Sequence, residues 1–422
     1  MSKQNSITHF LNSFLKRKGG FILASIIISK VFSFLLTIYI IKKLTVQEFG
    51  NISFAYNIIS FIIPFMGLGI YQSLGRYGAI AKSQLEKRRI FKFIFSRGSL
   101  ASIAIILFII LLSGLITSSL PNAQQYLIYL SFLVLSLFIL ESVKLLYRVY
   151  GLNKLFAYIE IAHTAITLIL GVLLSYFYGG TGYVIAIIIS PLVVALYLTI
   201  KNKLYEKTPK TNYSSNEKTA FWQYGFYTSL GGLAAKLLFS IDILMIGYLL
   251  KSEESVAIYK AATLIPFSLL FIPNGFIKTD IVKITSEYKN KAFLIGYIKN
   301  YIKVFTIISL LIFGILWLLA EPIMFYFGAS YKDYYALIPV LALGIIGAFV
   351  FRNLFGNLLD AIGWAKTSAT ISLSILVLDT VMNYFLVKQY GIMGAAYSTS
   401  ILLWLSGIIA ALAIVNYLKK LD

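Results

Sequence analysis

The stretch LASIAIILFIILLSGLITSS, residues 100–119, contains no charged side chain. About 20 apolar residues are enough for a helix to cross a hydrocarbon core of about 30 Å. Similar runs recur along the whole chain of 422 residues, of which 59% are hydrophobic and 13% charged. Because an ordinary soluble domain has about 25% charged residues, the composition excludes a soluble globular enzyme and predicts an all-α integral membrane protein.

Twelve transmembrane helices are predicted, one from each apolar run. The N-terminus, the even-numbered loops and the C-terminus hold 27 of the Lys and Arg residues, while the odd-numbered loops hold five and the spans five. Because basic loops stay in the cytoplasm, we expect both termini there. The predicted spans are 19–41, 52–74, 100–119, 126–147, 155–177, 182–200, 221–248, 256–276, 304–327, 335–359, 369–387 and 394–417.

The formal net charge of +21 follows from these basic loops. In a soluble protein it would indicate nucleic-acid binding, but here it orients the helices, and no nucleic-acid partner is expected. The absence of cysteine excludes disulfides and thiolate metal sites, and His9 and His163 are the only histidines. The sequence therefore predicts no metal centre and no cofactor other than a coupling ion.

Two internal alignments indicate a duplicated chain. A shift of 206 residues aligns Lys30 with Lys236, and a shift of 212 aligns the Tyr-Gly-x-x-Gly sequences that begin at Tyr178 and Tyr390. Each half holds an even number of spans, so both halves would insert in the same direction. We expect two pseudo-symmetric six-helix lobes around a central cavity.

The predicted lobe boundaries follow from a polar segment in the middle of the chain. Residues 207–218 contain proline, asparagine and serine among charged residues, which is typical of a linker. We expect an N-terminal lobe over residues 1–206 and a C-terminal lobe over residues 219–422.

Lys30 lies about midway through the first predicted span, roughly 15 Å from either surface, and Lys236 has the equivalent depth in the seventh. A charge at this depth costs on the order of 3 kcal/mol, so each lysine should face water, a partner or a ligand. An anion bound between the two would relieve their repulsion. The alternative is structural: Lys30 pairs with a carboxylate of a neighbouring helix, and Lys236 with Asp242 or Asp379.

Two carboxylates also fall within apolar runs. Asp242 follows Lys236 by six residues, which places the two about 120° apart around a helix. Asp379 is isolated in the eleventh span, so it is the better candidate for a charge partner or an ion-coupling group. A hydrogen bond from Asn383 or Thr380 would be the structural alternative.

Glu141, Lys144 and Arg148 follow one another at spacings of three and four, which puts them on one face of the fourth span. Arg352, in the tenth span, lies one position from the equivalent of Glu141 under the second alignment. This placement favours a shared lumen. An intrahelical ion pair with an arginine reaching the membrane edge explains the first three residues equally well.

Glu160 and His163 share one face of the fifth span. They could form a proton relay or only a hydrogen-bonded pair. The sequence shows no catalytic constellation, and the candidate site consists of charged residues. The candidate substrate-binding cations are Lys30, Lys236, Lys144, Arg148 and Arg352, and the candidate ion-coupling or charge partners are Asp242, Asp379, Glu141 and Glu160.

Four short motifs resemble those of a known family. They are IKKLTVQEFG at 41–50, GLG at 67–69, YKAA at 259–262 and YGIMGAA at 390–396. Together they resemble the polysaccharide-exporter branch of the multidrug/oligosaccharidyl-lipid/polysaccharide (MOP) flippase superfamily, which includes the Wzx O-antigen flippases.

The resemblance implies a MATE-like fold with a central cationic cavity and a flippase rather than an enzyme. Such a flippase moves an undecaprenyl-diphosphate-linked oligosaccharide, such as an O-antigen, lipopolysaccharide or capsule repeat unit, to the outer leaflet of the bacterial cytoplasmic membrane. It works by alternating access, with proton or sodium coupling in some relatives. Its expected partners are membrane lipid, the lipid-linked substrate and, as candidates, other polysaccharide-assembly proteins.

Three alternatives stay open from the residues alone. A MATE-type drug or cation antiporter would favour buried carboxylates over buried cations. A lipid II flippase of the same superfamily usually has more spans than are visible here. A membrane-embedded polysaccharide polymerase or ligase would normally have a large outward loop, and no such loop occurs in this sequence.

Overall fold

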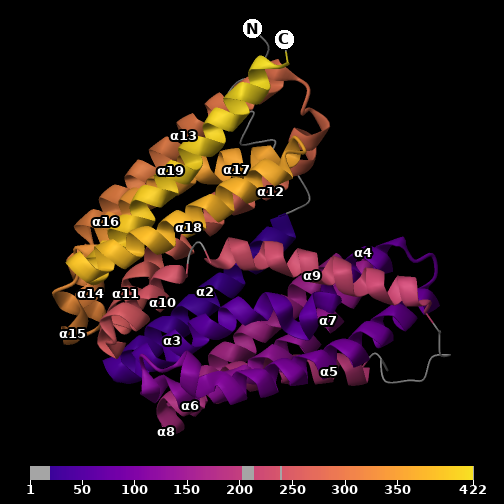
Figure 1. Cartoon of the computed structure of the whole chain (residues 1–422), viewed down its shortest axis with the longest axis horizontal. Coiled ribbons are helices and arrows are strands. Elements are labelled where there is room, and N and C mark those ends of the chain that lie inside the picture. Colours follow the sequence, from indigo (N-terminus) through magenta and orange to yellow (C-terminus); the bar gives the residue numbers. More distant parts are fainter. Residues whose placement is uncertain (1–19, 202–212, 238–239, 422) are drawn as a thin grey trace. The chain divides into compact units, whose positions relative to one another are not determined.

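A computed structural model of the chain describes residues 20–201, 213–237 and 240–421, which form helices and the turns that join them (Figure 1). The chain divides into two compact units. Of the described residues, 24–201, 213–237 and 251–257 form the unit that we call N-terminal, and 20–23, 240–250 and 258–421 form the C-terminal unit. Helices α2 and α11 contribute residues to both.

The elements follow one another along the chain with short connections. Up to the linker they are α2 (Gly20–Lys43), α3 (Val46–Ile62), η2 (Ile63–Gly69), α4 (Ile70–Ile80), α5 (Gln84–Ile116), η3 (Pro121–Ala123), α6 (Gln124–Ser131), α7 (Leu133–Val149) and α8 (Asn153–Lys201). After the linker they are α9 (Ser215–Leu237), α10 (Ile241–Leu250), α11 (Glu253–Ser268), α12 (Phe271–Ser286), α13 (Lys291–Leu318), α14 (Ala320–Phe327), α15 (Ala329–Lys332), α16 (Leu337–Gly347), η4 (Ala348–Arg352), α17 (Asn353–Ala361), α18 (Ala365–Tyr390) and α19 (Ile392–Lys419).

Nine helices in the described ranges are long and apolar enough to cross a membrane, so the chain is a multi-pass membrane protein. They are Val46–Gly78, Gln84–Ile116, Pro121–Val149, Lys154–Lys201, Glu253–Ile277, Lys291–Leu318, Leu337–Ala361, Lys366–Tyr390 and Ile392–Lys419. The predicted spans 155–177 and 182–200 fall in one of these stretches, and the predicted span 221–248 is divided between α9 and α10. A count of twelve spans stays a prediction.

Helix α8 is a hairpin of two antiparallel arms rather than one rod. Its backbone breaks at Gly179, with φ 59° and ψ −140°. The hydroxyls of Thr167 and Ser190, on opposite arms, are 2.7 Å apart. At Gly182 a Cβ atom would lie 2.0 Å from the carbonyl oxygen of Leu174, so only glycine allows the arms to approach this closely.

The equivalent turn in the second half has the same geometry. Gly391, between α18 and α19, has φ 59° and ψ −140° as well. A Cβ atom on Gly394 would lie 2.0 Å from the carbonyl oxygen of Leu386. Gly391, Gly394 and Leu386 are the positions that the 212-residue shift pairs with the α8 turn, and this local identity supports a duplicated chain.

The second predicted span is broken in its middle by η2. Met66 has ψ 132°, and the three residues that follow all have positive φ angles. The buried backbone N–H of Gly67 loses its helical partner and donates to the Ser102 hydroxyl at 2.9 Å. The ring of Phe138 lies where Cβ atoms on Gly67 and Gly98 would be, so the break is packed as well as capped.

Helix α9 belongs to the N-terminal unit. The Ser73 hydroxyl donates to the carbonyl oxygen of Phe221 at 2.5 Å. Gly69 and Gly225 face each other so closely that a Cβ atom on either would meet the other's carbonyl oxygen within 2.5 Å. The compact unit therefore extends beyond residue 206, and the predicted lobes, 1–206 and 219–422, stay a prediction.

A capping box begins α9. The Ser214 backbone N–H donates to the Glu217 carboxylate at 2.7 Å, and the Glu217 N–H donates to the Ser214 hydroxyl at 3.2 Å. The hydrogen bonds from Ser214 lower the pKa of Glu217.

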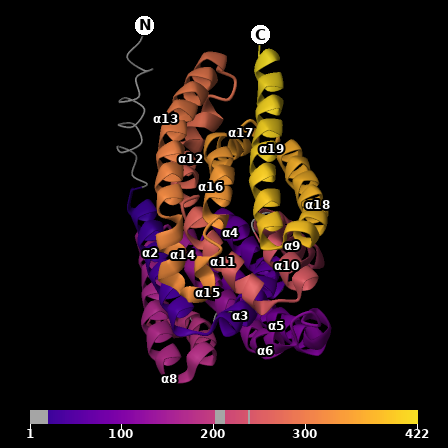
Figure 2. The ribbon, with the colours of Figure 1, turned by 90° about the vertical axis from the view of Figure 1, so that its left-hand side faces the viewer.

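In the C-terminal unit, α13, α16 and α19 lie side by side (Figure 2). Their core is aromatic: the rings of Tyr301 and Phe305 stack with centroids 4.2 Å apart, beside Phe276. The π-helical turn η4 breaks the regular backbone pattern, and the Tyr301 hydroxyl donates to the carbonyl oxygen of Phe349 there at 3.2 Å. Arg352 is the last residue of this turn.

Candidate functional site

Two polar networks lie among the apolar helices, one in each unit. The first is centred on Lys144 of α7, a buried lysine. Its ammonium group lies 2.5 Å from the Glu141 carboxylate, one turn earlier, and 2.6 Å from the Glu160 carboxylate of α8. Spacing along α7 predicts the first contact, and only the packing of α7 on α8 makes the second. Lys144 is therefore held by a structural ion pair.

The aromatic ring of Phe156 covers the cations of this network. It lies 5.2 Å from the Lys144 ammonium and 5.5 Å from the Arg148 guanidinium. Both distances are within the range of a cation–π interaction. Arg148 itself is exposed and forms no ion pair with any described residue.

Helix α2 brings Lys30 to the same network. The Thr164 hydroxyl of α8 donates to the Ser29 hydroxyl of α2 at 3.2 Å, which fixes the two helices against each other. Lys30 is exposed and lies within electrostatic range of Glu160, as does His163. The Glu160 carboxylate accepts a hydrogen bond from the Lys144 ammonium group, and its relay with His163 stays a prediction.

The network in the N-terminal unit has an excess of positive charge. Three cations, Lys30, Lys144 and Arg148, face two carboxylates, Glu141 and Glu160, which leaves a net charge of +1 with His163 neutral. Both carboxylates form ion pairs with Lys144, so the cations without an ion pair to a described residue are the exposed Lys30 and Arg148. Lys236, which the 206-residue shift aligns with Lys30, lies on α9, but its side chain is outside the described residues.

The second network joins two buried carboxylates in the C-terminal unit. Asp242 of α10 and Asp379 of α18 both accept a hydrogen bond from the amide group of Asn383, at 2.9 Å and 2.8 Å. Spacing along α18 predicts the bond between Asn383 and Asp379. The contact with Asp242, 141 residues away in sequence, comes from the packing of α10 on α18.

Neutral hydroxyl groups provide the other hydrogen bonds of these carboxylates. Tyr259 of α11 and Thr399 of α19 donate to Asp242 at 2.6 Å and 2.5 Å. Ser398 of α19 donates to Asp379 at 2.8 Å. Sequence reasoning missed these three residues as site residues, although the YKAA motif contains Tyr259. The signal available was the run of hydroxyl residues at 397–400 inside an otherwise apolar helix.

The carbonyl oxygen of the Asn383 side chain is buried and has no hydrogen-bond partner among the residues that the structure describes. It lies on the same side chain that joins the two carboxylates, so the network contains an oxygen able to take one more positive ligand. In residues 20–201, 213–237 and 240–421, no cluster of three or more His, Cys, Asp or Glu side chains could hold a metal ion. Two carboxylates with neutral oxygens suit a monovalent cation or a proton.

Arg352, the predicted cation of the second half, lies beside this network. Its guanidinium donates to the Ser406 hydroxyl at 3.2 Å and is within electrostatic range of Asp379. The structure therefore places Arg352 with Asp379, and not as an isolated cation. Of the sequence-predicted residues, it brings together Lys30, Glu141, Lys144, Arg148 and Glu160 in one unit, and Asp242, Arg352 and Asp379 in the other.

Solved structures with the same fold are membrane transporters. An inward-facing multidrug resistance MATE family transporter of the MOP superfamily matches with a TM-score of 0.80 and 16% identity, covering 93% of this chain and 95% of that one. A MOP superfamily transporter from Pyrococcus furiosus, described as having a binding pocket of reversed polarity, matches with a TM-score of 0.67 and 15% identity, covering 95% and 94%. An outward-facing MATE family transporter matches with a TM-score of 0.61 and 15% identity, covering 95% and 94%.

The comparison with family models is consistent with these structures. No curated protein matches the chain. The family described as "Polysaccharide biosynthesis protein" matches residues 15–279, which is more than half of the chain and includes the Lys144 network as well as α10 and Tyr259. The chain belongs to this polysaccharide biosynthesis protein family and has the fold of the MATE and MOP transporters.

Proposed function

We propose that the protein is a flippase that moves an undecaprenyl-diphosphate-linked oligosaccharide from the cytoplasmic to the outer leaflet of a bacterial cytoplasmic membrane. The excess of positive charge in the N-terminal unit is the observation that carries the proposal. Lys30 and Arg148 are exposed cations, and Glu141 and Glu160 are already used by Lys144. Cations of this kind attract a diphosphate, because charged hydrogen bonds to phosphate are strong. Membership of a polysaccharide biosynthesis family supports a saccharide as the rest of the substrate.

A cation bound between Asp242 and Asp379 would couple this movement to an ion gradient. The two carboxylates already share Asn383 and accept five hydrogen bonds in all, from four neutral residues. Sodium or a proton would neutralise part of the buried negative charge and use the free carbonyl oxygen of Asn383. Loading and release of the ion would then bias α10, α18 and α19 between two arrangements.

Deletion of the gene tests the proposal directly. A blocked flippase leaves its completed substrate in the membrane, so we expect one polyprenyl-diphosphate-linked oligosaccharide to accumulate. Mass spectrometry of the extracted lipids identifies the compound, and the wild-type gene should remove it. Restoration by a Lys30→Ala, Arg148→Ala double variant to the wild-type level would argue against the cation site.

A drug or cation antiporter is the second candidate, because the structural neighbours include multidrug MATE transporters. The buried pair Asp242 and Asp379 is the feature that favours it, since buried carboxylates recognise cationic compounds. The same deletion strain separates the two functions. New sensitivity to cationic drugs without any accumulated lipid-linked glycan would favour the antiporter.

A further inference from the structure

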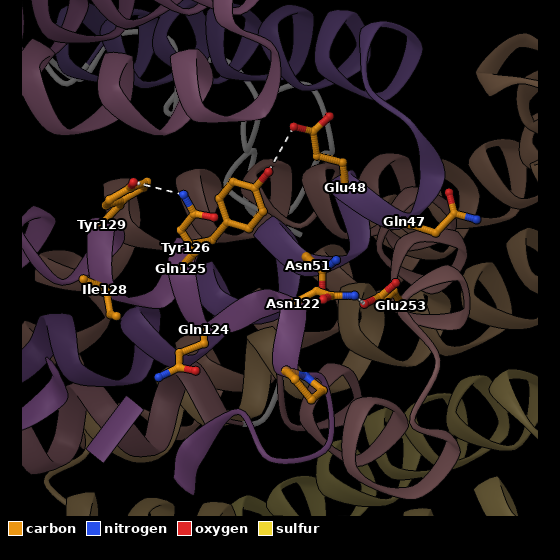
Figure 3. A pocket seen from close by; sticks show the side chains of 11 residues that line it. Gln47, Glu48, Asn51, Asn122, Gln124, Gln125, Tyr126, Ile128, Tyr129 and Glu253 are labelled. Atoms are coloured by element: carbon orange, nitrogen blue, oxygen red, sulfur yellow. Dashed lines mark hydrogen bonds between the residues drawn. The ribbon is translucent and has the colours of Figure 1, made fainter. Parts of the chain in front are cut away.

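A cavity of about 690 Å³ lies within the N-terminal unit, at the helix ends that are joined by odd-numbered predicted loops. Eleven residues line it (Figure 3). They come from the start of α3, from η3 and α6, and from Glu253 at the start of α11. The bias of basic residues toward the other loops places this end of the unit on the outer side of the membrane.

Glu48 holds one wall of the cavity in place. Thr45 caps α3 by accepting a hydrogen bond from the Glu48 backbone N–H at 3.2 Å. The Glu48 carboxylate accepts from the Tyr126 hydroxyl at 3.0 Å and from the backbone N–H of Gly180, at the tip of the α8 hairpin, at 2.9 Å. Three separate segments are thus fixed by one side chain, and the cavity is preformed.

The opposite wall is fixed by amide groups. The Asn122 amide donates to the Glu253 carboxylate at 2.8 Å, and the Gln125 amide donates to the Tyr129 hydroxyl at 3.0 Å (Figure 3). Each of these amides keeps a carbonyl oxygen and a second N–H group that can bind a ligand.

Asn51 lines the same cavity and is only 5% exposed. Its side-chain carbonyl oxygen has no hydrogen-bond partner in the structure. A buried polar atom of this kind is costly unless a ligand or water satisfies it. Asn51 is therefore a buried polar residue of the lining whose carbonyl oxygen no described residue satisfies.

The lining predicts the chemistry of the ligand. Five amide side chains, two tyrosines and two carboxylates line the cavity, and none of its eleven residues, all in the described part of the chain, is basic. Two carboxylates without a cation repel a phosphate. Amides both donate and accept, as vicinal sugar hydroxyls do, and tyrosine rings offer an apolar face to a sugar ring.

We propose that this cavity binds an uncharged saccharide, namely the sugar part of the exported lipid-linked substrate. The class of ligand follows from the lining alone, and its source rests on the proposed function. Both carboxylates of the lining already accept hydrogen bonds from Tyr126, Gly180 and Asn122, so the groups left for a ligand are mainly the amides.

The position of the cavity fits a substrate with two chemically different parts. Tyr126 in the cavity and Glu141 in the Lys144 network are 15 residues apart along α6 and α7. At 1.5 Å per residue this separation is about 22 Å. The sugar and the diphosphate are thus recognised at different depths, by amides near the surface and by cations farther in.

Binding of neutral sugars to the detergent-purified, full-length protein tests the proposal. The probes are cellobiose, lactose and N,N′-diacetylchitobiose, with glucose 1-phosphate as the anionic comparison, and the readout is saturation-transfer-difference NMR. The test variant is Asn122→Ala, Gln125→Ala, because both side chains are exposed and their loss should not unfold the protein. The matched control is Asn216→Ala, an exposed amide at the start of α9 and outside the cavity.

We expect at least one neutral disaccharide to bind to the wild type and to the control, and binding to weaken by about tenfold or more in the double variant, since two hydrogen-bonding side chains are lost. Equal binding by the double variant would overturn the proposal, as would binding of glucose 1-phosphate alone or of no sugar in the panel. These results are independent of the deletion strain. If that strain accumulates no lipid-linked glycan, the proposed function fails while a sugar site at this cavity stands.

Discussion

Lys144 illustrates at the scale of single residues what the sequence could and could not predict. Spacing along one helix predicts that Glu141 and Lys144 meet, and the structure shows this contact. The second contact, with Glu160, depends on which helices pack together, and periodicity contains no such information. The same holds for Asp242, whose bond from Asn383 joins distant parts of the chain. Depth and charge were predictable, and the choice of partners was not.

The ion pair of Lys144 predicts a loss of stability on neutral substitution. Lys144→Met leaves two carboxylates facing each other, so we expect the free energy of unfolding to fall by about 2 kcal/mol. Thermal unfolding of the purified protein in detergent measures the change. Lys154→Met, at an exposed lysine of α8, is the matched control and should have little effect. Adding Glu141→Gln and Glu160→Gln to Lys144→Met should restore most of the stability, and no restoration would contradict the ion-pair explanation.

Substitution of Lys30, unlike that of Lys144, should not lower the stability, because Lys30 is exposed and has no ion pair with a described residue. Lys30→Ala should leave thermal stability nearly unchanged and should reduce removal of the accumulated lipid-linked glycan in the deletion strain. Lys30→Arg, which keeps the charge, should retain more activity than Lys30→Ala. Equal activity of the two variants would show that charge at this position is not required.

The carboxylates Asp242 and Asp379 predict an effect of sodium on stability. An ion that binds only the folded protein raises its unfolding temperature. We expect the wild type to unfold at a higher temperature in sodium chloride than in choline chloride of equal ionic strength, and Asp379→Asn to lose this difference. Thr380→Ala, next to Asp379 but bonded to the Leu376 carbonyl oxygen, is the matched control. A sodium effect that persists in Asp379→Asn would place the ion elsewhere, and its absence in the wild type would favour a proton.

At the scale of elements, the helix breaks coincide with glycine and proline in the sequence. Pro64, Gly67 and Gly69 lie within the second predicted span, and η2 interrupts the helix there. The glycines at 179 and 391 lie at turns of identical geometry. The division of the predicted span 221–248 into α9 and α10 was missed, although Lys236, Ser240 and Asp242 interrupt its apolar run.

Gly67 offers a test of the break in η2. Its φ is 60°, and an added Cβ atom would lie 2.5 Å from the Phe138 ring. Strain and overpacking together should lower the free energy of unfolding of Gly67→Ala by about 2 kcal/mol or more. Gly314→Ala is the matched control, since its Cβ atom would meet nothing within 4 Å. We expect this control to be neutral or slightly stabilising, as measured by thermal unfolding. Equal stability of both variants would contradict the packing that we describe.

At the scale of the whole molecule, the recurring apolar runs predicted a multi-pass topology without any knowledge of packing. Long apolar helices confirm the membrane class. The composition of the compact units was not predictable, since α9 joins the N-terminal unit through close glycine contacts and not through a hydrophobic pattern. The orientation in the membrane stays a prediction that labelling can check.

The natural chain contains no cysteine, so one introduced cysteine reports its side of the membrane without background. Gln125→Cys, at an exposed position beside the outer cavity, should react with a membrane-impermeant maleimide in intact cells. Asn216→Cys, within the predicted linker and at the start of α9, should react only after the membrane is permeabilised. The cysteine-free parent controls for unspecific labelling. The reverse pattern would invert the topology and place the cavity in the cytoplasm.

The hydrogen bond from Gly180 to Glu48 has a consequence for how the chain is inserted during synthesis. The turn around Gly179 has no charged residue, so electrostatic retention does not determine how far the α8 arms extend across the bilayer. Their vertical register is fixed by a carboxylate made 132 residues earlier. Glu48 precedes α8 in the chain, so this contact can form only once Gly180 has been synthesised, and its loss should leave the depth of the α8 hairpin in the membrane unset.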